Sequence, residues 1–281
     1  MKIIITGGKG MLGRTLQKRL KSHDIIVADK DVLDITDCVS VDSFVKDCKP
    51  EAIIHCAAMT NVDACESNID DAFRVNAIGS LNIASSCNKY HAKLIAVSTD
   101  YVFEGTKKEP YNEYDTPNPM TVYGKSKFAG EQAVRTHCPN HIIARISWLY
   151  GSGGPSFIHT MMKLADGSRD ELKIVDDQWG NPTSTDAVAE TIDKFLLNEN
   201  LNGTFHVTCE GETSWYGLAK ELFALKNINQ KLIPCTTNEF PRPAPRPFNS
   251  RLDKMNLRLY GLPSMPHWKD ALKEFLKTEN F

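Results

Sequence analysis

Five short apolar runs in the first half of the chain constrain its fold most strongly. The runs are continuous rather than alternating, which is typical of strands buried on both faces of a parallel sheet. Amphipathic stretches at residues 11–22, 39–48, 69–90 and 126–138 follow a helical pattern and separate the runs. This alternation predicts an α/β fold with a doubly wound parallel sheet. The expected strands are residues 2–6, 25–28, 52–56, 94–98 and 142–146.

The pattern loosens after Trp148, which predicts a smaller, intertwined C-terminal region. We therefore expect one domain over residues 1–150 and a second region over residues 151–281. A helix at 185–197 is expected to return to the first domain. Further helical and strand patterns lie at 157–165, 172–175 and 203–207, and a proline-rich stretch at 240–247 is too rich in proline for a helix or a central strand.

The charge balance argues against nucleic acid or a membrane surface as a partner. The chain has 33 basic and 35 acidic residues in 281, a net charge of −2, and no long run of either sign. No apolar run approaches the roughly 20 residues that span a bilayer. Met1 and Lys2 lead straight into a strand pattern, so we expect a cytoplasmic protein that binds a small molecule.

The cysteines and histidines give no sign of a metal site. Eight of each are present, without a C-x-x-C pair or an H-E-x-x-H spacing. We therefore expect no bound metal.

The stretch TGGKGMLG, residues 6–13, directly follows the first apolar run and precedes a helical pattern. A dinucleotide fingerprint requires this context. Gly7 would allow the sharp exit from the strand, Gly10 the close approach of a pyrophosphate, and Gly13 the packing of the helix on the sheet. The free N–H groups at the helix start would then face the phosphates. A plain glycine-rich turn is the alternative.

Charged residues after the second strand strengthen the prediction of a dinucleotide site. Asp29 ends that strand, where an acidic residue can bind an adenosine ribose. The neighbouring Lys30 suits a 2′-phosphate instead, so the residues leave NADH and NADPH open. Asp34 stands where an adenine contact is expected. Each of these side chains could equally be an ordinary solvated charge.

Tyr123 and Lys127 are four residues apart, which places both side chains on one face of a helix. A nearby ammonium stabilises a phenolate and brings a phenol towards the pKa that acid–base catalysis requires. Thr99 ends the fourth strand, at the sheet edge where ligands of such folds bind. A threonine hydroxyl there would align a carbonyl oxygen near Tyr123. Together with a nicotinamide, these three groups predict a carbonyl reductase.

The chain resembles the extended short-chain dehydrogenase/reductases, and among them the dTDP-4-dehydrorhamnose reductase family. The resemblance covers almost the whole chain and is most specific in STDYVF (98–103) and DQWGNPT (177–183). It implies a Rossmann-like domain, a nucleotide-sugar-binding C-terminal region, and reduction of the C4 ketone of dTDP-4-dehydro-L-rhamnose for polysaccharide synthesis. NADPH, slightly favoured, or NADH would be the cofactor.

The resemblance also implies roles for individual residues. Thr99, Tyr123 and Lys127 match the catalytic triad, with Lys127 lowering the phenol pKa and binding ribose. Substrate positions are Thr99, Asp100, Tyr101, Trp148 and, with Arg251 as an alternative, Arg246. The implied cofactor positions are Gly7, Gly10, Met11, Leu12, Gly13, Asp29, Lys30, Asp34, Ile35, Ala57, Ala58, Met59, Thr60, Val97, Tyr123 and Lys127.

Other functions fit the same residues. An epimerase or dehydratase of nucleotide sugars would use the Tyr–Lys pair with a tightly held NAD. A non-catalytic regulatory subunit, like that of methionine adenosyltransferase, would need no acid–base pair. Some relatives are thought to dimerise around magnesium held by glutamates, but Thr15 follows Arg14 here and is no such ligand. The sequence is compatible with a monomer or a homodimer.

Overall fold

A six-stranded sheet forms the centre of the computed structural model, which describes residues 1–279 and 281. Its strand order is β10-β5-β4-β3-β1-β2, and every neighbouring pair is parallel. The predicted doubly wound parallel sheet is confirmed. The strands are β1 (Lys2–Thr6), β2 (Asp24–Ala28), β3 (Ala52–His55), β4 (Lys93–Thr99), β5 (His141–Ile146) and β10 (Gly203–His206).

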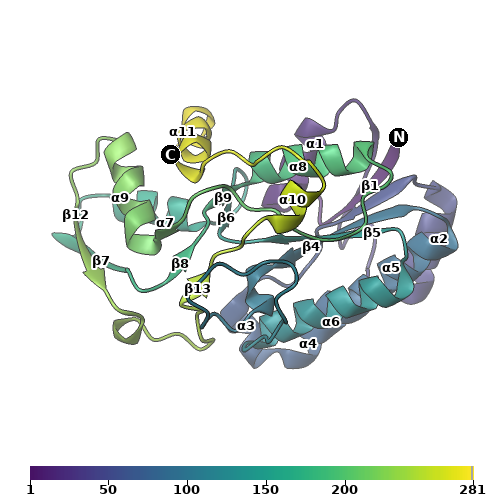
Figure 1. The fold of residues 1–281 in the computed structure, drawn as a ribbon, viewed down its shortest axis with the longest axis horizontal. Helices are drawn as coiled ribbons and strands as arrows, with labels where there is room; N and C mark the ends of the chain where they lie inside the picture. Colours follow the sequence, from purple (N-terminus) through teal and green to yellow (C-terminus); the bar gives the residue numbers. More distant parts are fainter. Residues whose placement is uncertain (280) are drawn as a thin grey trace.

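Helices cover both faces of this sheet (Figure 1). Ile3 and Ile5 of β1 face a core shared with α1 and α8, whereas Ile4 faces a core shared with α2, α5 and α6. Burial on both faces explains why the apolar runs are continuous. These helices are α1 (Met11–Arg19), α8 (Thr185–Leu197), α2 (Cys38–Cys48), α5 (Gly79–Lys89) and α6 (Val122–His137).

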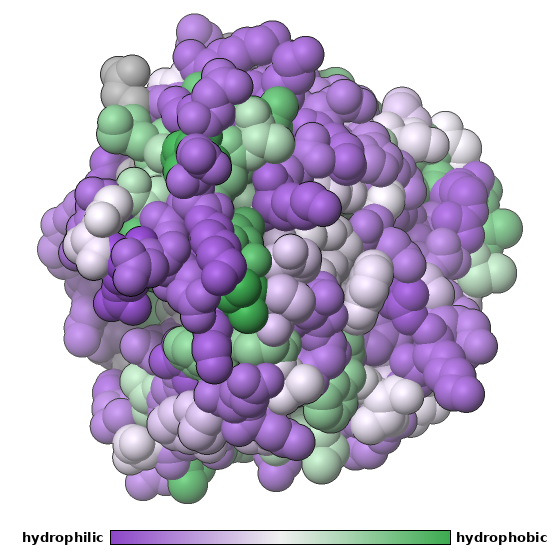
Figure 2. Space-filling model, turned by 90° about the vertical axis from the view of Figure 1, so that its left-hand side faces the viewer, coloured by the Kyte–Doolittle hydropathy of each residue, from purple (hydrophilic) through white to green (hydrophobic). Residues whose placement is uncertain are grey.

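The second region lies at the carboxyl edge of the sheet and is built from short elements (Figure 1). Strands β7 and β12 pair in parallel, and β8 lies between β11 and β13. The side of the molecule that carries α9 and β12 is mostly hydrophilic (Figure 2). The elements are α7 (Phe157–Leu164), β7 (Glu171–Val175), β8 (Trp179–Gly180), β9 (Thr183–Ser184), β11 (Thr213–Ser214), α9 (Trp215–Leu225), β12 (Lys231–Cys235), β13 (Asn249–Ser250) and α11 (Trp268–Thr278). The short strand β6 (Leu149–Tyr150) pairs with β9, and α10 (Met255–Leu259) packs against β10 of the central sheet.

Two helix predictions need correction. The helix expected at 126–138 begins earlier, at Val122, because the Thr121 hydroxyl accepts the Gly124 N–H at 3.0 Å and caps it. The segment expected as one helix at 69–90 consists of three helical segments, namely α4 (Ile69–Phe73), a π-helical turn (Arg74–Ile78) and α5. The short helix α3 (Val62–Ser67) precedes them. The division of the chain at residue 150 stays a prediction.

None of the helices in the described residues is long and apolar enough to cross a membrane.

His55 lies buried at the end of β3 and joins two elements. Its Nδ1 is 2.7 Å from the Thr6 hydroxyl of β1, and its Nε2 is 3.2 Å from the Ser80 hydroxyl of α5. Burial, helped by the charge of Lys127, lowers the pKa of His55 to about 3. The imidazole is therefore neutral in the folded protein at any pH near neutrality.

We expect His55→Gln to reduce the acid sensitivity of the fold. Between pH 6.5 and 3 the unfolded chain holds a proton on His55 that the folded chain does not, so stability falls as the pH falls. For one histidine this slope approaches about 1.4 kcal/mol per pH unit. Urea unfolding from about pH 7 to about pH 5 measures it, with the exposed His137→Gln as control. Equal slopes in the His55 variant and the wild type would contradict the assignment.

Candidate active site

A cavity of about 460 Å³ runs along the carboxyl ends of β1 to β4. All the residues predicted to bind the cofactor line this cavity, except Met59. The lining positions are Gly7, Gly10, Met11, Leu12, Gly13, Asp29, Lys30, Asp34, Ile35, Ala57, Ala58, Thr60, Val97, Tyr123 and Lys127.

The glycine turn leaves room for a dinucleotide and directs a helix start towards it. Gly7 has a φ of +66°, and a Cβ there would lie 2.8 Å from the Ala57 main chain. A Cβ at Gly13 would lie 2.6 Å from Gly8 Cα, so only glycine lets α1 pack this closely. Gly10 is the N-cap residue that precedes α1, and no side chain caps the helix there. The first N–H groups of α1 have no partner within the helix, as a pyrophosphate site requires.

Acidic and basic side chains both line this cavity: Asp29 and Asp34 are acidic, and Lys30 and Arg74 are basic. The Asp29 carboxylate accepts the Lys9 N–H at 2.5 Å, which anchors it to the glycine turn. Asp34 accepts the N–H and the hydroxyl of Thr36, and these bonds lower its pKa. Arg74 also lines the cavity, although the sequence analysis did not single it out.

Met59 contacts a buried amide rather than the cavity. Its N–H donates to Asn76 Oδ1 at 2.8 Å, and Asn76 Nδ2 donates both to the Met59 carbonyl and to Ser126 of α6. Asn76 lies in the π-helical turn, a type of irregularity often found at functional sites. Asn76 thus ties the loop after β3 to helix α6.

Thr99, Tyr123 and Lys127 come together where β4 ends against α6. Thr99 is a polar neighbour of the Tyr123 phenol, and Thr99 Oγ1 donates to Asp100 Oδ1 at 2.9 Å. Lys127 Nζ donates to the Val97 carbonyl at 2.8 Å. The four-residue spacing on α6 therefore puts both side chains against the same strand.

Burial dominates the protonation of these groups. It raises the pKa of the Tyr123 phenol, and the neighbouring Thr99 hydroxyl opposes this rise only in part. It lowers the pKa of Lys127 to about 8 and raises that of Asp100 to about 6. Tyr123 is thus protonated at neutral pH, as an acid must be. The expected lowering of its pKa by Lys127 stays a prediction, because the ammonium here binds a carbonyl.

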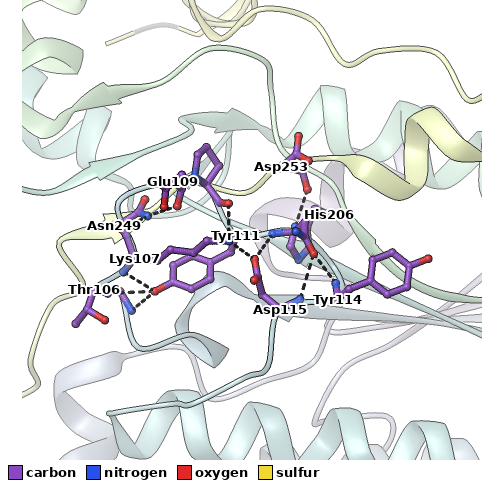
Figure 3. Close-up of polar contacts among 12 residues, drawn as sticks. Thr106, Lys107, Glu109, Tyr111, Tyr114, Asp115, His206, Asn249 and Asp253 are labelled. Atoms are coloured by element: carbon purple, nitrogen blue, oxygen red, sulfur yellow. Dashed lines mark hydrogen bonds and ion pairs between the residues drawn. The ribbon is translucent and has the colours of Figure 1, made fainter.

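The loop between Thr99 and Tyr123 is held in place by a polar network (Figure 3). The buried Tyr111 oxygen accepts three successive N–H groups, those of Gly105, Thr106 and Lys107, each at 3.1 Å. Asn249 Nδ2 donates to the carbonyls of Lys107 and Glu109. The network fastens this loop to β13 and so to the second region.

A second cavity, of about 590 Å³, begins beside Asp100 and Tyr101 and extends into the second region. Tyr101 meets Tyr123 edge to face, with ring centroids 5.5 Å apart, so the two cavities approach each other at Tyr123. Asp100 is 5% exposed, and its Oδ2 has no hydrogen-bond partner. A buried carboxylate oxygen without a partner is available to accept a ligand hydroxyl.

Aromatic rings form one wall of the second cavity. Trp148 has a φ of +47°, and its indole stacks on Trp215 with centroids 3.5 Å apart and an interplanar angle of 6°. Phe157 continues the row, 4.6 Å from Trp215. A Cβ at Gly180 would lie 2.7 Å from Trp148 Nε1, so this glycine admits the indole.

The structure separates the two arginines proposed for the substrate. Arg246 lines the second cavity, where its guanidinium meets Asp63 at 2.9 Å. Arg251 is bound to Glu212 at 3.0 Å and is not part of that wall. Thr99 lies between the cavities and lines neither.

The sequence analysis missed several residues of the second cavity. Gln178 lies within DQWGNPT, one of the motifs most specific to the family resemblance, so a signal for it existed. Phe240 and Arg242 lie in the proline-rich stretch, which was not assigned to the site, and no role was predicted for Asp63, Phe157, Trp215 or Ser250. Among the described residues, no group of three or more histidine, cysteine or acidic side chains is placed to hold a metal ion.

Comparisons with known proteins agree with this geometry. Residues 1–281 match the family model described as RmlD substrate binding domain. A dTDP-4-dehydrorhamnose reductase from Streptomyces griseus is 39% identical, over 96% of this chain and 91% of that protein. A solved dTDP-4-dehydrorhamnose reductase from Clostridium acetobutylicum is 46% identical, with a TM-score of 0.96 over 99% of both chains. The Bacillus anthracis enzyme, solved in complex with NADP, is 40% identical with the same TM-score and coverage.

We expect Gly13→Ala to weaken NADPH binding. The new Cβ would meet main-chain atoms of Gly7 and Gly8, which cannot turn aside as a side chain can. Overpacking of this kind costs about 1–3 kcal/mol. A displaced α1 should therefore raise the Kd for NADPH about tenfold or more, measured by fluorescence titration. A variant that melts like the wild type and binds NADPH with unchanged Kd would contradict the phosphate-binding role of this turn.

Proposed function

Because this chain belongs to the RmlD substrate binding domain family, we propose that it reduces the C4 ketone of dTDP-4-dehydro-L-rhamnose to dTDP-L-rhamnose. It is an oxidoreductase that uses NADPH or NADH. The observation that carries the proposal is the place of Tyr123, which lines the first cavity while its ring meets that of Tyr101 in the wall of the second at 5.5 Å. One cavity suits a dinucleotide, and the other opens on a buried carboxylate and stacked indoles.

Each residue of the trio has a distinct task in the proposed reaction. The bound reduced nicotinamide supplies the hydride that adds to the C4 carbon. Tyr123 gives its proton to the oxygen of that carbonyl, so that the alkoxide becomes a hydroxyl. Thr99 holds the oxygen beside Tyr123. Lys127 binds cofactor ribose hydroxyls and stabilises the phenolate that remains, until solvent returns the proton.

The second cavity offers different chemistry at its two ends. Asp100 lies at the end next to Tyr123, and at neutral pH its carboxylate can accept hydroxyls of the sugar. Arg246 contributes a charge that suits the diphosphate. The aromatic row of Trp148, Trp215 and Phe157 gives a flat apolar wall for the remainder of the nucleotide.

We expect one NADPH or NADH to be consumed for each dTDP-4-dehydro-L-rhamnose reduced, and Tyr123→Phe to lower kcat by about 10²- to 10⁴-fold. Absorbance of the reduced cofactor measures both. NADPH titration of the variant serves as control, because the substitution keeps the aromatic ring and removes only the proton donor. Near-normal turnover by the variant would contradict the role of Tyr123. Conversion of the sugar without net cofactor consumption would instead indicate an epimerase or a dehydratase.

A further inference from the structure

Three consecutive residues at the end of β4 each face helix α6. The Val97 carbonyl accepts from Lys127, the Ser98 hydroxyl donates to Glu131 at 2.6 Å, and Thr99 neighbours the Tyr123 phenol. The α6 partners are residues 123, 127 and 131, so they follow one face of the helix at intervals of four. Two of these contacts involve the catalytic trio, and the third involves Glu131.

Glu131 is buried and fully engaged. Besides Ser98, its carboxylate accepts from Arg145 Nε at 2.9 Å, Arg145 Nη2 at 2.8 Å and Arg135 Nη2 at 2.8 Å. Arg145 comes from β5 and is 1% exposed. Burial by itself would raise the pKa of Glu131, but the two arginines and Ser98 lower it to about 2. The side chain is therefore a permanent anion that joins α6 to both β4 and β5.

We propose that Glu131 is a positioning residue for the reduction proposed above, on which this inference rests: it holds Tyr123 against Thr99 and keeps Lys127 charged. The first task follows from the position of Glu131 on helix α6. Glu131 is two helical turns beyond Tyr123, so its bonds to Ser98 and Arg145 prevent α6 from sliding or rotating along the strands. A small shift of α6 would separate the phenol from Thr99.

The second task follows from the charges around Lys127. Glu131 on α6 favours the ammonium, and burial disfavours it. The Cys56 thiol after β3 is uncharged, because burial raises its pKa to about 12. His55, also beside Lys127, is neutral because burial lowers its pKa to about 3. The cations that pair with Glu131 are Arg145 and Arg135. Without the carboxylate, the burial of Lys127 would be uncompensated, and the ammonium would lose its proton at lower pH.

A purely structural ion pair is the competing explanation, and three variants separate the two. Glu131→Gln removes the charge and keeps the size. Ser98→Ala removes one bond and keeps the charge. Arg135→Gln removes a partly exposed cation and leaves Glu131 and Arg145 paired. Glu190→Gln, a half-exposed glutamate of α8 that pairs with Lys194, is the matched control.

Two readouts are needed. The pH dependence of kcat reports the alkaline limit of activity, and competitive labelling of Lys127 with acetic anhydride, without sugar, reports its pKa. We expect Glu131→Gln to lower the alkaline limit of kcat and the pKa of Lys127 by about one pH unit or more, since a charge at close range shifts a pKa by roughly 1–3 units. Arg135→Gln should leave both unchanged, because Glu131 stays an anion paired with Arg145. Ser98→Ala should lower kcat about tenfold at an unchanged Lys127 pKa, because a small displacement of the catalytic groups is costly. Glu190→Gln should change nothing.

Unchanged Lys127 labelling and an unchanged pH profile in a folded Glu131→Gln protein would overturn the proposal. If that variant does not fold, Ser98→Ala decides: an unchanged kcat in a folded Ser98→Ala protein contradicts the positioning role. The labelling needs no turnover. A protein that is inactive on the sugar and still gives the predicted Lys127 shift therefore contradicts the proposed substrate and not the role of Glu131.

Discussion

Parallel pairing of the central strands is the constraint on which the rest of the structure depends. Because β1, β3, β4 and β5 all run the same way, their carboxyl ends meet at one edge of the sheet. The residues that follow them include Gly7, Ala57, Asp100 and Trp148, which are far apart in the sequence. A phosphate turn, a cofactor loop, an acid site and an aromatic wall thus become neighbours. Burial on both faces keeps this edge rigid.

The second region adds a second cavity beside that edge. It contributes only short elements, and its attachment depends on side chains such as Tyr111 and Asn249, which fasten the loop before α6 to β13. The proline-rich stretch is more than a connector, since Arg242 and Arg246 line the second cavity. Residues from opposite ends of the chain therefore share one wall, as the Asp63–Arg246 ion pair illustrates.

The sequence predicted what depends on local patterns. The strands of the sheet, the glycine turn and the pairing of Tyr123 with Lys127 follow from periodicity and spacing. The early start of α6 was missed because Gly124 weakens the helical pattern, whereas the Thr121 cap became evident only in the structure. Trp215 and Glu131 could not be assigned roles, because their partners Trp148 and Arg145 are brought to them by the fold. The lowered pKa expected for Tyr123 also depends on burial, which spacing does not reveal.

The account's central claim is that the two cavities meet so that hydride passes directly from cofactor to the sugar C4. Transfer from NADPH deuterated at its reactive C4 position, followed by NMR of the product, tests this most directly. The account predicts one deuterium per sugar, bound to C4, in each product molecule. A product with solvent hydrogen at C4, or with deuterium at another carbon, would contradict it.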